Sequence, residues 1–179
     1  MPISVSMRKR LRNLFILLLL ILVGGFLIPE RFTLPVEGLA KADYNQKSFW
    51  AYPWGKSVTH KGVDIFAKSG SKVLSPIDGI VIRTGNSDRA GNFIAILGPK
   101  WRVHYHAHLA SSVVKTGQRL KPGDYIGTVG ATGNAQGKAP HLHYSIYSMI
   151  PLPWRYDDSI QGWKKAFFIN PIPYLNSAF

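Results

Sequence analysis

From residue 72 onward, the sequence alternates short runs of Val, Ile, Leu and aromatic residues with clusters of turn-forming residues. Short apolar and β-branched runs bounded by Gly, Pro, Asn and Asp are typical of β-strands, because a helix needs a longer periodic segment. The runs expected to form strands are residues 72–74, 80–83, 93–97, 102–106, 125–129 and 142–146. The chain is therefore predicted to be all-β, with one small domain of antiparallel strands.

The segments between these runs are predicted to be turns. They are rich in Gly, Pro, Asn and Asp, and they lie at residues 77–79, 84–86, 98–100, 121–124 and 132–134. Turn residues at this spacing favour one compact sheet, and 179 residues are enough for a single hydrophobic core. The absence of cysteine excludes a disulfide framework, a cysteine-ligated zinc site and a thiol nucleophile.

The N-terminal region has a different character. Four basic residues, Arg8, Lys9, Arg10 and Arg12, precede fifteen uncharged and almost wholly apolar residues at 14–28. This pattern is typical of a targeting segment. Fifteen helical residues rise about 22 Å, less than the ~30 Å hydrocarbon layer of a membrane, so a cleaved signal peptide is an alternative to a membrane anchor.

An uncleaved anchor is the favoured interpretation because the cleavage signal is weak. Charged residues follow the apolar run, and the A-x-A pattern at 40–42 lies twelve residues beyond it. Four basic residues before the run, against Arg31 just after it, place the N-terminus in the cytoplasm. We therefore expect a single-pass protein of the inner (cytoplasmic) membrane, with the remaining chain on the periplasmic side.

Four regions are expected along the chain. Residues 1–30 form the basic tip and the anchor or signal segment, and residues 31–56 form an irregular lead-in. The core domain spans residues 57–147, and the aromatic and Pro-rich tail, 148–179, is expected to pack on it. Within the tail, residues 159–168 are compatible with one short helix.

The six histidines fall into three clusters whose members are spaced by even numbers of residues. The clusters are His60 with Asp64, the trio His104, His106 and His108, and the pair His141 and His143. Alternate residues of an extended strand share a face, so the members of each cluster are expected to point the same way. A catalytic zinc site needs three ligands from His, Asp, Glu or Cys and one open position. His60, Asp64 and one member of the His141/His143 pair supply such a set.

A framework of glycines surrounds these histidines. Its motifs are HKGVDI at 60–65, PIDGIV at 76–81, HL at 108–109, GxxLxxG at 117–123, IGxxGxTG at 126–133 and HLHY at 141–144. Together they resemble the lysostaphin/LytM-type zinc metallopeptidase family over about residues 57–147. Residues 170–175 look like the closing segment of that family.

The resemblance implies a role for each matching residue. His60, Asp64 and His143 match the zinc ligands, for one Zn²⁺ per chain, and His108 and His141 match the catalytic histidines. The family fold is a small antiparallel sheet with zinc in a groove, and most members cut peptide bonds in peptidoglycan. The resemblance therefore implies peptidoglycan as the substrate, whereas the membrane is expected as a partner because of the N-terminal segment.

Residue chemistry is compatible with that role. The chain has no HExxH glutamate, so His108 or His141 is expected to take the water proton while the other stabilises the oxyanion. The order of these two roles stays open. Aspartates such as Asp78, Asp88 and Asp124 lie in turn contexts, so a glycosidase carboxylate pair is not expected.

Two histidines depart from the family pattern. His106 stands where the family usually carries Tyr, which affects the predicted shape of the groove. His104 has no family role and is interpreted as a strand residue near the groove.

Three alternatives are weaker. One is a non-catalytic peptidoglycan-binding or regulatory module of the same fold, disfavoured because all five matching residues are present. Another is an unrelated metal lyase or hydrolase built on the trio at 104–108, which leaves His60 and Asp64 unexplained. The formal charge of +13 points to an anionic partner. A nucleic acid is not expected to be that partner, because the targeting segment removes the chain from the cytoplasm.

Overall fold

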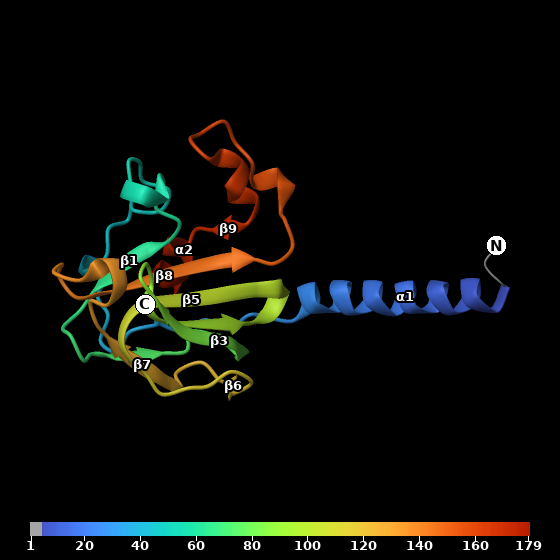
Figure 1. Cartoon of the computed structure of the whole chain (residues 1–179), viewed down its shortest axis with the longest axis horizontal. Helices are drawn as coiled ribbons and strands as arrows, with labels where there is room; N and C mark the ends of the chain where they lie inside the picture. Colours follow the sequence, from blue (N-terminus) through green and yellow to red (C-terminus); the bar gives the residue numbers. More distant parts are fainter. Residues whose placement is uncertain (1–4) are drawn as a thin grey trace.

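The computed structural model describes residues 5–179 and consists of a long N-terminal helix followed by an antiparallel sheet domain (Figure 1). The helices are α1 (Val5–Leu27) and α2 (Ile172–Ser177). The strands are β1 (Val63–Phe66), β2 (Lys72–Leu74), β3 (Gly79–Ser87), β4 (Gly91–Leu97), β5 (Arg102–Ser112), β6 (Arg119–Leu120), β7 (Tyr125–Val129), β8 (His141–Ser148) and β9 (Phe168–Ile169). Six 3₁₀ turns lie between them, at η1 (Lys41–Asp43), η2 (Gly55–Ser57), η3 (Pro99–Trp101), η4 (Gly133–Ala135), η5 (Pro153–Arg155) and η6 (Gly162–Ala166).

All strand pairs are antiparallel, in the order β1-β8-β5-β4-β3-β6. β7 pairs with both β5 and β2, and β9 pairs with β8. Strand β8 therefore lies between β1 and β5. Its residue His143 is opposite Asp64 of β1 and Ala107 of β5, so three segments far apart in the sequence meet at one point of the sheet.

Strand alternation separates the core from the site. In β1 and β8, the fully buried residues Val63, Ile65, Leu142, Tyr144 and Ile146 face the core. Each such aliphatic or aromatic side chain contributes about 1.5–3 kcal/mol by leaving water. The intervening residues of both strands point to the opposite face.

The structure corrects the turn predicted at residues 84–86, which lies inside β3. Gly85 pairs with Phe93 of β4, and a Cβ on Gly85 would come within 3.1 Å of the Phe93 ring. The glycine therefore leaves room for the aromatic ring, and the connection between β3 and β4 falls at residues 88–90. The strand predictions also missed β1, β6 and β9.

The helix considered for residues 159–168 is wrong. Gln161 has a positive φ of 58°, which no right-handed helix accommodates, and the segment forms only the 3₁₀ turn η6 followed by β9. A Cβ on Gly162 would lie 1.9 Å from the Asp157 carbonyl oxygen, so the chain is tightly folded there. The helix of the tail is α2, which begins at Ile172.

The lead-in after α1 is built into the domain. Val36 and Leu39 are buried in the core, and Val36 forms an isolated β-bridge with Val73. The side chain of Glu30 is only 4% exposed, and it forms an ion pair with Arg102 and a hydrogen bond with His104. Burial raises the pKa of Glu30, but the hydrogen bond from His104 and the charge of Arg102 lower it more, and the net shift is downward.

Helix α1 extends from one end of the sheet domain (Figure 1). It contains the basic residues of the N-terminus as well as the apolar run, and its 23 residues correspond to about 34 Å. By length and composition it can cross a membrane, and a signal sequence meets the same criterion. Trp101 Nε1 donates a hydrogen bond to the Leu22 carbonyl at 2.8 Å, so the helix contacts the sheet domain.

Candidate metal centre and active site

A groove of about 1190 Å³ runs over the face of β1, β5 and β8 opposite the core. Asp64 and Phe66 of β1, Tyr105 and Ala107 of β5, and residues of β8 form its floor. Residues 53–57 and the β3–β4 connection form its walls. The groove therefore lies where the strand alternation places the residues that do not enter the core.

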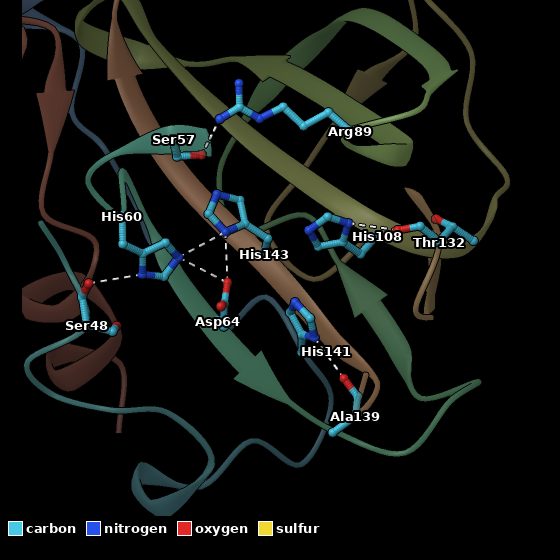
Figure 2. Close-up of polar contacts among 10 residues, drawn as sticks. All are labelled: Ser48, Ser57, His60, Asp64, Arg89, His108, Thr132, Ala139, His141 and His143. Atoms are coloured by element: carbon cyan, nitrogen blue, oxygen red, sulfur yellow. Dashed lines mark hydrogen bonds and ion pairs between the residues drawn. The ribbon is translucent and has the colours of Figure 1, made fainter. Parts of the chain in front are cut away.

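Three side chains converge in this groove (Figure 2). His60 Nε2 lies 3.1 Å from Asp64 Oδ1 and 3.2 Å from His143 Nδ1, and His143 Nδ1 lies 2.8 Å from Asp64 Oδ1. These three atoms form a group that could hold a metal ion. Two imidazole nitrogens and a carboxylate oxygen are ligands that zinc accepts, and three protein ligands leave a position open. The donor set therefore fits a catalytic metal.

His60 is held in place by its surroundings. It is only 1% exposed, and its Nδ1 lies 3.0 Å from the Ser48 carbonyl oxygen. A carbonyl oxygen only accepts, so Nδ1 carries the proton and the Nε2 lone pair points at Asp64 and His143. Trp54 stacks on the His60 ring, with centroids 4.1 Å apart and planes at 17°.

His60, Asp64 and His143 are called the triad below, and their charges depend on one another. Burial raises the pKa of Asp64, but its close contacts with His143 and His60 outweigh it and hold that pKa well below its usual range. Burial lowers the pKa of His143, although Asp64 acts in the opposite direction. An ionised carboxylate beside neutral imidazoles is the protonation state in which all three residues can ligate a cation.

His108 and His141 lie beside the triad. Like His60, each has its Nδ1 close to a backbone carbonyl oxygen. His108 Nδ1 is 2.9 Å from the Thr132 carbonyl oxygen, and His141 Nδ1 is 2.8 Å from that of Ala139. Both Nε2 atoms are consequently left as acceptors in the neutral rings. The two ring centroids are 5.1 Å apart (Figure 2). Burial lowers the pKa of His108 to about 4, with a smaller contribution from His143.

The expectation that the trio in β5 shares one face is wrong at His108. Its φ is +64°, which interrupts the strand alternation and turns the side chain into the groove with Ala107. His104 and His106 are fully buried on the core side. Within residues 5–179 the trio therefore forms no metal group, and the alternative centre has no geometric support.

His104 is a strand residue, as predicted, and lies in β5 beside Tyr105 of the groove floor, but the side chains of His104 and His106 are buried in the core and do not line the groove. His104 Nδ1 contacts the Tyr144 hydroxyl at 2.5 Å and its Nε2 contacts Glu30 at 3.2 Å. Neither ring nitrogen of His106 has a hydrogen-bond partner within residues 5–179. Burial lowers the pKa of His106 to about 3, so it is neutral at pH 7.

Sequence reasoning missed the residues that position this site. Ser48 contributes a backbone carbonyl, which the sequence does not indicate, and Trp54 belongs to the lead-in at 31–56, where no site residue is expected. Arg89 and Ser57 approach each other across the groove. Lys61 is adjacent to His60, and burial lowers its pKa, with Lys164 and Arg89 contributing less.

Comparison with known proteins gives a consistent result. The model of "Peptidase family M23" matches residues 58–152. The chain is 38% identical to an L-Ala--D-Glu endopeptidase of Bacillus subtilis over 155 residues, covering 82% of this chain and 43% of that protein. It is 37% identical to the peptidoglycan DD-endopeptidase ShyC of Vibrio cholerae over 92 residues, covering 51% of this chain and 21% of that protein. The chain thus spans less than half the length of these curated relatives.

Solved structures share the fold. The catalytic domain of lysostaphin from Staphylococcus simulans is 28% identical with a TM-score of 0.57, covering 72% of this chain and 89% of that domain. A zinc-containing peptidase from Vibrio cholerae is 32% identical with a TM-score of 0.54, covering 65% of this chain and 36% of that one. The predicted antiparallel all-β fold is confirmed.

Proposed function

The chain belongs to peptidase family M23, as its motifs indicated, and on that basis we propose that it is a zinc-dependent endopeptidase that hydrolyses peptide bonds in peptidoglycan stems or cross-bridges. One observation carries the proposal. His60, Asp64 and His143 converge in the groove, and His108 and His141 lie beside them, each held through Nδ1 by a backbone carbonyl oxygen. A non-catalytic module would not need this arrangement.

Membership of a metallopeptidase family implies a metal ion, and the donor set favours one Zn²⁺. His60 Nε2, Asp64 Oδ1 and His143 Nδ1 would hold it. When bound, zinc brings the pKa of a coordinated water to about 7 and can polarise a carbonyl group. The hydrogen bond from His60 to Ser48 keeps the first of these ligands in the required tautomer.

The two remaining histidines supply the proton transfers. Nε2 of one accepts the proton of the attacking water and passes it to the leaving amine as the C–N bond breaks. Nε2 of the other, which takes its proton from solvent, donates a hydrogen bond to the oxyanion of the tetrahedral intermediate. The backbone carbonyls of Thr132 and Ala139 fix both rings through Nδ1, so each Nε2 is oriented before the substrate binds. Either assignment of His108 and His141 to these roles is compatible with the geometry.

The groove chemistry favours a peptide bond over a glycosidic bond. Its lining carboxylates, within residues 5–179, are Asp64 and Asp88. Asp64 is engaged with His60 and His143, which leaves no pair of carboxylates to act as acid and base on a sugar acetal. Cleavage is therefore assigned to the peptide portion of peptidoglycan.

Digestion of purified peptidoglycan tests this proposal directly. The zinc-loaded protein should release new amino groups without new reducing sugar ends, and mass spectrometry of the products identifies the bond. The rate should fall as salt rises from about 0.05 to 0.5 M, because the Debye length shrinks to a few ångströms and the attraction between a basic protein and an acidic polymer is screened. New reducing ends would contradict the peptidase assignment.

A peptidoglycan-directed enzyme acts outside the cytoplasm, and we assign α1 as an uncleaved inner-membrane anchor with its N-terminus in the cytoplasm. The structure supports retention of the lead-in, because cleavage after Ala42 would remove Glu30, Val36 and Leu39 from their buried positions. Contact between Trp101 and Leu22 also ties α1 to the domain.

The topology makes a separate prediction. The membrane fraction should contain a protein of full-length mass, and a reporter fused after Phe179 should be active only when exported. A matched fusion after Arg12, on the basic tip, should be active only in the cytoplasm. Recovery of a soluble form that begins at Asp43 would show cleavage and contradict the anchor.

A further inference from the structure

Arg89 reaches across the groove beside the candidate metal centre. It lies in the connection between β3 and β4, and its side chain extends past His143 toward Ser57 on the opposite wall (Figure 2). The guanidinium donates a hydrogen bond from Nη2 to Ser57 Oγ and forms no ion pair within residues 5–179. An arginine has five N–H donors, so most of its hydrogen-bonding capacity is open to a ligand.

The groove as a whole carries uncompensated positive charge. Five cationic side chains line it: Lys56, Lys61, Arg89, Lys138 and Lys164. Asp64 belongs to the triad, and Asp88, the other lining carboxylate, forms no ion pair within the described residues. A cleft lined by one sign of charge favours a ligand of the opposite sign.

Arg89 is better placed than Lys61 to meet a ligand beside the triad. The Lys61 ammonium is already surrounded by acceptors, at 2.8 Å from the Ser57 carbonyl, 3.0 Å from Thr59 Oγ1 and 2.7 Å from Gln161 Oε1. Lys61 thus stabilises the wall that carries Ser57. The Arg89 guanidinium donates to the neutral Ser57 hydroxyl. A carboxylate that displaces this hydroxyl can form a bidentate ion pair with the guanidinium.

We infer that Arg89 binds a carboxylate of the substrate peptide close to the scissile bond, which makes the groove selective for acidic stem peptides over uncharged bridges such as oligoglycine. The inference rests on the proposed function and assigns its substrate class. Ser57 holds the guanidinium across the groove in the free protein. An entering carboxylate takes its place and accepts two parallel N–H bonds, which fixes the register of the peptide over the triad.

The test compares native peptidoglycan with the same material after its carboxyl groups are converted to carboxamides by carbodiimide and excess ammonia. Full-length protein is assayed as wild type, Arg89→Gln, Arg89→Lys and Arg119→Gln. Arg119 is an exposed residue of β6 outside the groove. Each Gln variant removes one arginine, so Arg119→Gln has the same net charge as Arg89→Gln. The control therefore separates general attraction from local recognition.

Wild type and Arg119→Gln should share one preference for native over amidated material. Arg89→Gln should lose roughly 10- to 100-fold of that preference with zinc content unchanged, through slower cleavage of the native form. Arg89→Lys should be intermediate, because lysine keeps the charge without the planar fork.

Equal loss of preference in Arg89→Gln and Arg119→Gln, or no loss in either, would overturn the inference while the peptidase function stands. Loss of zinc from Arg89→Gln would assign Arg89 a structural role and overturn it as well. Failure of zinc-loaded wild type to release amino groups from either material would refute the proposed function, and this inference with it.

Discussion

Asp64→Asn should bind no zinc and should hydrolyse no peptidoglycan, although the protein still folds. The amide has nearly the shape of the carboxylate but lacks its charge, and Asp64 Oδ1 is the atom that both His60 Nε2 and His143 Nδ1 approach. Two remaining ligands are too few for a hydrolytic zinc site. The loss of turnover should exceed the roughly 10- to 100-fold typical of removing an outer-sphere partner. His60→Ala and His143→Ala should behave in the same way.

Metal content per chain and the rate of amino-group release check this prediction together. Asp88→Asn is the matched control, because Asp88 also lines the groove but lies outside the triad. It should retain one zinc per chain. Stoichiometric zinc in Asp64→Asn or His143→Ala, combined with zinc loss in a folded His104→Ala, would show that the ligands are assigned wrongly.

The site could be predicted from the sequence for two reasons. Alternate residues of a strand share one face, and the histidines lie in motifs that resemble a known family. His141 and His143 are two apart on one strand, and β8 does place both on the groove face, while Leu142 and Tyr144 enter the core. His60 precedes β1, so the alternation of side chains along a strand does not apply to it. Its ring is held toward Asp64 by the hydrogen bond to the Ser48 carbonyl and by stacking against Trp54.

The prediction that alternate residues share one face failed where the backbone leaves the extended region. His104, His106 and His108 have the same even spacing as the other clusters, but the positive φ of His108 separates it from the other two. A positive φ is uncommon outside glycine, so the identity of the residue gave no indication of this conformation at His108. The resemblance to the family identified His108 as a groove residue, whereas spacing alone would have grouped it with two core histidines.

Contacts between residues far apart in the chain could not be predicted from the sequence, because they depend on how the strands pair. Arg89 and Ser57 are 32 residues apart, and Glu30 and His104 are 74 apart. Each pair meets only because the sheet brings its elements together. Strand positions were easier, since β2 and β7 have the predicted bounds, but Gly85 was read as a break although it lies in β3 against Phe93.

His108→Asn and His141→Asn should keep zinc and lose at least about a hundredfold in turnover, or roughly 2.7 kcal/mol of transition-state stabilisation. The Asn side-chain amide can occupy the position of the imidazole Nδ1–H, so the hydrogen bonds to the Thr132 and Ala139 carbonyls can be retained. What disappears is Nε2, the atom assigned to proton transfer. In these variants turnover should therefore fall while zinc content stays unchanged, whereas variants of the triad residues should lose both.

The same two variants can order the roles of the histidines. A general base must be neutral to act, so wild-type turnover should decline as acid protonates it, and the variant that lacks the base should lose this decline. The variant that lacks the oxyanion donor should be slower at every pH and keep the decline, because the base is still present. Residual turnover rescued by added imidazole would further identify a missing proton carrier. If both Asn variants lost zinc, the two histidines would be ligands, and the division of the site into three ligands and two catalytic residues would be wrong.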